Sequence, residues 1–459
     1  NLVDLFNGMV SSDKLVLNML LVLRAVNVAL VQTWFVPDEY WQSIEIAHKQ
    51  VFGYGYETWE WTVGLRSYLY PLLFSAVYYV PKISGMGAYA VILAPRLAQA
   101  VLSATTEWCV YRCFKRTCGI RFAKWFLLSM CTSWFWWYCA TRTLINTLEC
   151  NLVCIALYYL SCDQFQFSYN YFKFVVVASV AFVVRPTIIT VWMPLYCLYV
   201  CMNTNGSLHF GRLLSKAILI GVFVLCVSTL IDTLCYGRLV SVHYNFFKFN
   251  ILQNQGTFYG SHPFHWYLTQ AFPVILSTHL PFMLYGVFIF YTRTLKFKQA
   301  NNVTHLCKLS AVICLFTVFV YSIPGHKEFR FLLCLLPFLH VFTSLGLLSL
   351  PSRSTKLAIT WLLLTNIPIA LYTGLIHQSG PSKVMEFLRK DISQSTQIMQ
   401  PSSSKLEVMF LCPCHSTPYY AFINKNIAMD FLTCHPDLNA TPAYTDQADE
   451  FYASPQTWL

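Results

Sequence analysis

The sequence predicts an all-α polytopic membrane protein, because apolar residues dominate, charged residues are scarce and long apolar runs recur. Hydrophobic residues make up 56% of the 459 residues and charged residues 11%, whereas a typical soluble domain carries about 25% charged residues. The mean hydropathy is +0.50. A soluble protein with so little charge could not cover its surface, and a bilayer removes that difficulty.

The apolar runs predict about eleven membrane spans, since one span needs about 20 apolar residues. They lie at residues 14–34, 66–83, 89–111, 122–140, 143–161, 172–202, 214–235, 269–291, 307–323, 329–350 and 356–375. Residues 172–202 contain Arg185-Pro186, where proline kinks or breaks a helix. That stretch is one long span or two short ones, so the count is eleven or twelve.

Two parts of the chain follow from these runs. Residues 1–375 form a membrane bundle with two long loops, an aromatic and charged one at 35–65 and one at 236–268 that is rich in His, Asn and Gly. Residues 376–459 are polar and contain proline, and we expect them to form a small water-facing C-terminal domain.

Basic residues in two short loops indicate the orientation, because Lys and Arg collect on the cytosolic side. They are Arg212, Lys216, Arg293, Lys296 and Lys298. Loop 236–268 and the C-terminal domain then face the opposite side, where Asn439-Ala440-Thr441 would be a usable glycosylation sequon. The basic loop 112–124 also favours the cytosol, but an eleven-span count places it on the other side.

The formal net charge of +11 fits such loops and anionic lipid. No basic stretch is interleaved with stacking aromatics, so no nucleic-acid partner is expected. Most of the 18 cysteines lie in apolar runs and behave as small hydrophobic residues. Only Cys412, Cys414 and Cys434 lie in polar sequence. We expect a Cys414–Cys434 disulfide in an oxidising compartment, and free thiols are the alternative.

The first loop carries the first candidate site. Asp38 and Glu39 directly follow Pro37, a pattern that on its own is typical of a helix start. Acids framed by aromatic rings also suit a sugar, whose hydroxyls donate to carboxylates while its apolar face packs on a ring. The further candidates for sugar contacts in this loop are Trp41, His48, Trp59, Glu60 and Arg66.

The run from His326 to Phe331 is the second candidate site. Basic residues at a membrane edge are often anchors that extend to the interface. His326, Lys327 and Arg330 within five residues also make an anion site, because Arg offers a fork for phosphate oxygens and Lys a point charge.

Residues 256–267 are the third candidate site, with Tyr259, His262 and His265 as substrate contacts. Pro263 between the two histidines indicates a loop, and two histidines without a third ligand rarely hold a metal. No metal is therefore predicted. Elsewhere, Arg142 and Glu149 lie seven residues apart on one helical face, and we interpret them as a structural pair.

These motifs resemble glycosyltransferase family 22. The run from His326 to Phe331 matches the family's HKExRF signature. Other stretches are similar to the branch of the family that adds the third mannose of the glycosylphosphatidylinositol (GPI) anchor: residues 35–48, 58–61, 65–71, 245–254, 256–267 and 414–420. The similarity extends from about residue 20 to the end, and Phe264 stands where the branch has Trp.

The resemblance implies a GT-C helical bundle in the endoplasmic reticulum membrane with its active site in the lumen. It implies inverting transfer of mannose from dolichyl-phosphate mannose, in α1,2 linkage, to the GPI precursor, without a metal or another cofactor. Asp38 would then be the base, with Glu39 assisting or acting as the base itself. His326, Lys327 and Arg330 would stabilise the leaving phosphate.

Other functions compete with this one. The mannosyltransferases of N-glycan assembly and the fourth-mannose GPI enzyme would share the fold and the signature. A transporter predicts discontinuous helices repeated between two halves, and no internal repeat is visible. A non-catalytic scaffold has no reason to hold Asp38 and Arg330 near one cavity.

Overall fold

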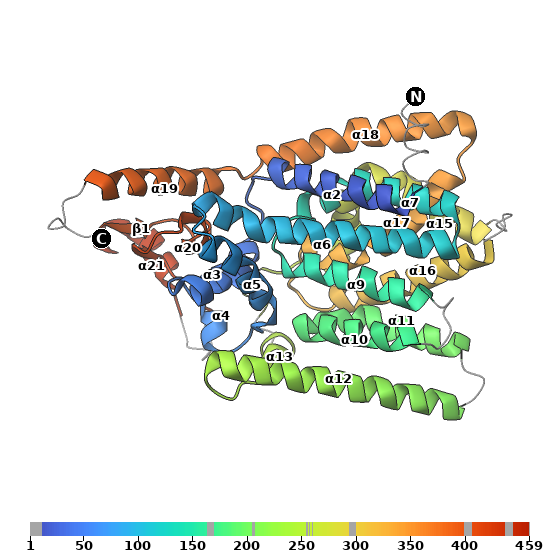
Figure 1. Ribbon diagram of the computed structural model, residues 1–459, viewed down its shortest axis with the longest axis horizontal. Coiled ribbons are helices and arrows are strands. Elements are labelled where there is room, and N and C mark those ends of the chain that lie inside the picture. Colours follow the sequence, from blue (N-terminus) through green and yellow to red (C-terminus); the bar gives the residue numbers. More distant parts are fainter. Residues whose placement is uncertain are drawn as a thin grey trace.

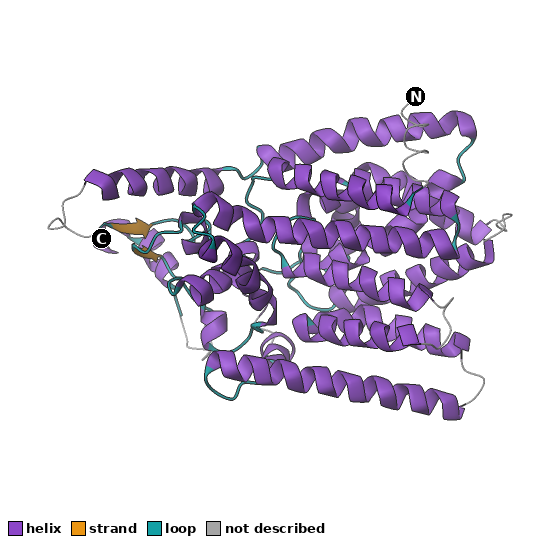
Figure 2. Cartoon of the chain, viewed as in Figure 1, coloured by secondary structure: helices purple, strands orange, loops and turns teal. Residues whose placement is uncertain are grey.

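The computed structural model describes residues 12–162, 169–203, 207–253, 256, 258, 260–292, 300–398, 406–436 and 444–458. Long helices lie side by side along one direction, and a smaller part with the one described sheet caps one end of the bundle (Figures 1 and 2). We call this end the capped end. This arrangement confirms the predicted all-α membrane bundle.

The bundle is built mainly from long helices that run along one direction, with short helical segments between some of them. In chain order they are α2 (Asp13–Leu30), α6 (Ala88–Thr117), α7 (Ile120–Thr132), α8 (Trp134–Cys139), α9 (Ile145–Cys162), α10 (Tyr169–Val184), η2 (Pro186–Ile188), α11 (Ile189–Asn203), α12 (Ser207–Tyr236), η5 (Tyr267–Ala271), α14 (Phe272–Leu276), η6 (Ser277–His279), α15 (Leu280–Thr292), α16 (Ala300–Ser322), η7 (Phe329–Leu335), α17 (Leu336–Leu348) and α18 (Ser352–Leu375).

The capped end combines the two long loops with the C-terminal segment. Its elements are η1 (Tyr40–Ile44), α3 (Glu45–Phe52), α4 (Trp59–Thr62), α5 (Leu69–Ile83), α13 (Val242–Phe247), η3 (Lys248–Leu252), α19 (Gly380–Ile398), β1 (Glu407–Phe410), α20 (Tyr420–Ile423), β2 (Ala428–Phe431), α21 (Gln447–Ala453) and α22 (Pro455–Trp458). β1 and β2 pair in parallel, with Glu407 opposite Ala428.

One hydrophobic cluster joins the first loop to the C-terminal segment. Trp41 from η1, Met385 from α19 and Phe431 from β2 are buried in it together. Residues about 390 positions apart in the sequence therefore pack as one layer over the bundle.

Among the described residues, six helices are long and apolar enough to cross a membrane: Ala88–Thr117, Gly211–Tyr236, Tyr267–Thr292, Ala300–Ser322, Phe329–Leu348 and Ser352–Gln394. Three shorter apolar helices accompany them: Ile145–Leu160, Asn170–Val184 and Pro186–Leu198. Many outward-facing side chains are apolar, as a lipid-facing surface requires. The total number of spans stays a prediction.

Three expected spans differ from the structure. Residues 172–202 form two helices, α10 and α11, because the chain is extended at Arg185 and restarts at Pro186. Residues 122–140 are interrupted at Ser133, whose hydroxyl caps α8 by accepting from the Trp136 N–H. Residues 66–83 form the 15-residue α5, which at about 1.5 Å per residue is too short for a hydrocarbon core of about 30 Å.

These differences remove the conflict over loop 112–124. α5 lies beside α3 at the capped end, while α6 and α12 span the length of the bundle (Figure 1). With α5 excluded and residues 172–202 counted as two helices, the junction of α6 and α7 lies at the same end as the first turns of α12 (Figure 1), whose sequence contains Arg212 and Lys216. The basic residues of these two described segments therefore lie at the end opposite the cap, as the positive-inside rule requires.

Two glycines allow α15 and α17 to approach closely. A Cβ added at Gly286 would overlap the Phe342 carbonyl, and one at Gly346 would overlap the Phe282 carbonyl. Small residues at a helix crossing let backbones touch, which is a common way for helices to associate in a membrane.

We predict that Gly286→Ala destabilises the protein by roughly 1–3 kcal/mol, because the new methyl group meets a backbone carbonyl that cannot rotate away. Gly221→Ala in α12 is the matched control, since the nearest atom there is 3.8 Å from the added Cβ. Thermal unfolding of the purified proteins measures the difference. Equal midpoints for the two variants would contradict this account of the crossing.

Candidate functional site

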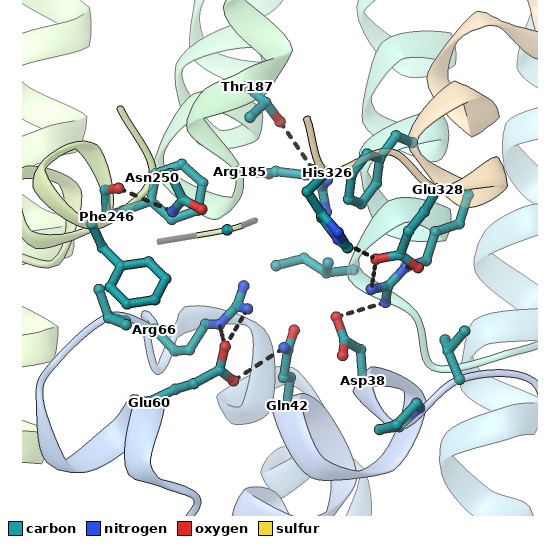
Figure 3. A pocket seen from close by; sticks show the side chains of 18 of the residues that line it. Asp38, Gln42, Glu60, Arg66, Arg185, Thr187, Phe246, Asn250, His326 and Glu328 are labelled. Atoms are coloured by element: carbon teal, nitrogen blue, oxygen red, sulfur yellow. Dashed lines mark hydrogen bonds and ion pairs between the residues drawn. The ribbon is translucent and has the colours of Figure 1, made fainter. Parts of the chain in front are cut away.

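A cavity of about 800 Å³ lies between the cap and the bundle. Its walls come from the first loop, the α10–α11 junction, α13, the loop before η5, the run from His326 to Phe331 and the C-terminal segment. Polar side chains from these segments point toward a common space (Figure 3). All three candidate sites of the sequence therefore contribute to one cavity.

Asp38 and Glu39 point in different directions although they are neighbours. Asp38 lines the cavity. The Glu39 side chain is 2% exposed and its Oε2 accepts from Arg142 Nη1 at 2.7 Å, while Arg142 is 1% exposed. Glu39 is not among the lining residues. This corrects its prediction as a base, because a carboxylate held by a buried guanidinium cannot reach a substrate in the cavity.

Arg330 carries the central charges of the cavity. Its Nη1 lies 2.6 Å from Asp38 Oδ2, which makes a close ion pair. Its Nε and Nη2 donate to the two oxygens of Glu328 at 2.7 and 2.5 Å. His326 Nε2 lies 3.1 Å from Glu328 Oε1. The Arg330 guanidinium therefore forms ion pairs with two carboxylates, those of Asp38 and Glu328 (Figure 3).

Glu328 is the anchor of this group rather than a proton donor. Burial alone would raise its pKa, but the charge of Arg330 and hydrogen bonds from His326 and Arg330 outweigh burial and hold the pKa well below its usual range. Glu328 therefore stays ionised and positions the two basic side chains.

A second polar group lies across the cavity. Arg66 Nε and Nη2 donate to Glu60 Oε1 at 3.1 and 2.6 Å, and Gln42 Nε2 donates to Glu60 Oε2 at 3.1 Å (Figure 3). Trp59 lines the same side. Hydrogen-bonding groups beside an aromatic ring suit a sugar.

Lys327 lines the cavity, but its ammonium group is hydrogen-bonded to backbone carbonyls. It donates to the carbonyls of His262 and Pro324 at 3.0 and 2.5 Å. It therefore holds the loop before η5 against the run from His326 to Phe331, and Arg330 and His326 remain as the phosphate candidates of that run.

The C-terminal segment closes the wall near Asp38. Cys414 and Cys434 form a disulfide, and His415 between them in the fold packs its ring against Trp41 at 4.6 Å. Trp41 Nε1 donates to the Thr417 carbonyl at 3.0 Å. Burial lowers the pKa of His415 to about 4, with the charge of His435 adding to the effect, so this imidazole is neutral near pH 7.

Glu45 in the first loop is hydrogen-bonded to the same C-terminal segment. Its carboxylate accepts backbone N–H groups of Tyr56, Tyr420 and Ala421 at 3.3, 3.2 and 2.9 Å. Burial raises the pKa of Glu45 to about 7 although these hydrogen bonds oppose the shift. The contact joins the first loop to α20 across the cavity wall.

Several expectations require correction. Arg142 pairs with Glu39, and Glu149 pairs with Arg185 at 3.3 Å, so the expected Arg142–Glu149 pair is wrong. His48 is buried between the Tyr54 carbonyl and Asn424 Oδ1, and the exposed His265 bonds to Thr269. Neither histidine lines the cavity.

Three predictions lie outside the described residues: Tyr259, the sequon at 439–441, and the basic loop with Arg293, Lys296 and Lys298. Several polar lining residues were not predicted as site residues, among them Arg185 and His415. Arg185 stood beside a proline in an apolar run, and that charge at membrane depth was a signal for function. His415 gave no such signal, because only the fold brings it to Asp38.

Comparison with known proteins decides the family. Residues 15–424 match the Alg9-like mannosyltransferase family. The chain belongs to this family. It is 42% identical over 453 residues to "GPI alpha-1,2-mannosyltransferase 3" of Mus musculus, covering 98% of this chain and 79% of that protein. It is 39% identical to "GPI mannosyltransferase 3" of Drosophila melanogaster over 96% of this chain and 75% of that protein.

The fold of this Alg9-like chain is also found in a solved structure. ArnT from Cupriavidus metallidurans bound to undecaprenyl phosphate superposes with a TM-score of 0.63 at 12% identity, covering 90% of this chain and 85% of that chain. The bundle is therefore that of a GT-C membrane glycosyltransferase, as expected from the sequence.

We predict that Glu39→Ala destabilises this mannosyltransferase by about 3–5 kcal/mol, because it leaves the buried Arg142 guanidinium without its carboxylate. Thermal unfolding and the yield of folded protein measure the effect. Asp38→Asn is the matched control, since Asp38 lies in the open cavity. A Glu39→Ala protein that folds like wild type would disprove the structural role.

We also predict that replacing Cys414 and Cys434 together by Ser costs about 3 kcal/mol, because a closed loop of this length restricts the unfolded chain. Their sequence separation is 20 residues. Cys412→Ser is the control, since Cys412 is a free thiol in the same segment. Unfolding with and without a reductant measures the loss, and an unchanged midpoint in the double variant would count against the bond.

Proposed function

We propose that this chain transfers mannose from dolichyl-phosphate mannose, in α1,2 linkage, to the second mannose of the GPI precursor, and so adds the third mannose. The observation that carries the proposal is the single cavity in which Asp38 meets Arg330 at 2.6 Å. The names of the relatives at 39–42% identity support the acceptor and the linkage.

Asp38 is the proposed base. Inverting transfer needs one group that takes the proton of the acceptor hydroxyl as its oxygen attacks the anomeric carbon. Asp38 is the carboxylate of the first loop that reaches the cavity without being bound into the fold by several hydrogen bonds. Glu60 is held by Arg66 and Gln42, which suits it to position hydroxyls.

Arg330 and His326 are the proposed partners of the leaving phosphate. The bond from the anomeric carbon to the phosphate oxygen breaks and leaves a lipid phosphate, a good leaving group that needs charge stabilisation rather than a proton. The phosphate would compete with Asp38 for the Arg330 guanidinium. Donor binding would thereby release Asp38 to act as base.

This chemistry uses no metal or other cofactor, because a guanidinium in a shielded cavity supplies the positive charge. Dolichyl-phosphate mannose and the GPI precursor are the substrates. The site is proposed to face the lumen of the endoplasmic reticulum, since the basic loop 112–124 and the basic start of α12 lie at the other end of the bundle. An N-glycan mannosyltransferase or a fourth-mannose GPI enzyme is the competing assignment.

A rescue experiment tests the proposal. Cells that lack the third GPI mannosyltransferase receive wild type, Asp38→Asn, Arg330→Ala, Arg330→Lys or the control His265→Ala, and protein levels are checked. We expect Asp38→Asn to lower transfer by about 10²–10⁴-fold and Arg330→Ala by about 10²–10³-fold. Arg330→Lys should retain part of the activity, because the charge remains without the fork.

The readouts are GPI-anchored protein at the cell surface and the lipid that accumulates. Wild type and His265→Ala should rescue, whereas Asp38→Asn should leave a precursor with two mannoses. Failure of an expressed and correctly located wild type would refute the acceptor assignment. Full rescue by Asp38→Asn would refute Asp38 as the base.

A further inference from the structure

A second cavity, of about 360 Å³, lies at the capped end and shares no residue with the first. The N-terminal turn of α6, the middle of α19 and the end of α20 meet here. The lining residues are Ala88, Tyr89, Arg389, Lys390, Ser393, Gln394, Ile423 and Lys425. We call it the basic pocket.

Arg389 is the unusual residue of this pocket. It is 5% exposed, and neither its Nη1 nor its Nη2 has a hydrogen-bond acceptor among the described residues. Its guanidinium carbon lies 4.0 Å from the centre of the Tyr89 ring and 5.7 Å from that of Phe422. The rings hold the cation, but a buried charge without an anion is costly.

The charges around Arg389 favour an external anion. Lys390 and Lys425 line the same pocket, and none of its described lining residues is acidic. The nearby Glu386 pairs with Lys390 at 2.9 Å and also feels the charge of Arg389. The side chains of Lys390 and Glu386 are 62% and 42% exposed, and such a solvent-screened pair contributes little. Three cations against one carboxylate leave an excess of positive charge.

A phosphate group fits these donors. An Arg fork and two Lys point charges are a typical set for its oxygens, and the Gln394 amide adds another donor. Exposed apolar side chains lie beside the pocket in the sequence, namely Ile83 and Met86 before Tyr89, and Phe387 before Arg389. Apolar neighbours next to a basic pocket are suited to a lipid with a charged head group.

We propose that the basic pocket binds a phosphate group, carried by the head group of an anionic membrane lipid. The pocket is also connected to the catalytic wall, because α20 packs against α3, α6 and α19. Occupancy of the pocket would therefore stabilise the C-terminal segment that contains His415 and the two residues that donate to Glu45, Tyr420 and Ala421. The site is independent of the proposed transfer reaction.

Thermal unfolding of the purified full chain in detergent micelles tests the site, with three added probes. The probes are phosphatidylinositol, zwitterionic phosphatidylcholine and inorganic phosphate. The Lys390→Ser/Lys425→Ser variant removes two cations at exposed positions, so it should fold. The Lys356→Ser/Lys383→Ser variant is the control, because it removes the same charge from exposed positions outside the pocket.

We expect phosphatidylinositol to raise the midpoint in a saturable way, and phosphatidylcholine to leave it unchanged. The pocket variant should need about tenfold more phosphatidylinositol for the same shift, while the control variant should behave as wild type. An equal effect of inorganic phosphate would support the anion site with free phosphate as its source. No shift in wild type, or an equal shift in the pocket variant, would overturn the proposal.

Discussion

The position of Asp38 depends on the ion pair that its neighbour Glu39 makes with Arg142. Arg142 also donates to the carbonyls of Thr33 and Tyr138 at 2.7 and 2.8 Å, so one guanidinium ties the end of α2, the first loop and α8 together. Because Glu39 is fixed on the inner side, Asp38 one residue earlier faces the cavity. The first loop thus holds the proposed base at the cavity wall.

The same device recurs in the bundle. Arg24 pairs with Glu107, and Arg185 pairs with Glu149, in each case between segments that are distant in the sequence. A buried ion pair gains little stability over an apolar contact, but removing one partner is very costly. In a bilayer, an unpaired charge is not hydrated by water and is therefore costly. These pairs therefore select which helices lie together more than they add stability.

Much of the fold could be predicted from the sequence. The partners of the buried charged side chains could not. Apolar runs and Pro186 marked helices and a break, because length and composition decide both. The same criteria failed for α5, whose apolar face packs on α3 instead of crossing. Motif chemistry located Asp38 and Arg330. The seven-residue spacing predicted Glu149 as the partner of Arg142. Glu39 is the partner instead, because burial and long-range contacts decide the pairing. The place of His415 in the cavity wall could not be predicted, because only the fold brings this residue near Asp38.

One guanidinium between two carboxylates makes the cavity responsive to its donor. Glu328 accepts two hydrogen bonds from Arg330, whereas Asp38 makes one contact with it, at 2.6 Å. A third anion at Arg330 would repel both carboxylates, and Asp38, with its one contact, has fewer bonds to Arg330 than Glu328 has. Asp38 is therefore the group that a donor phosphate would displace. The proposed base is paired with Arg330 here, and we expect a donor phosphate at Arg330 to release it.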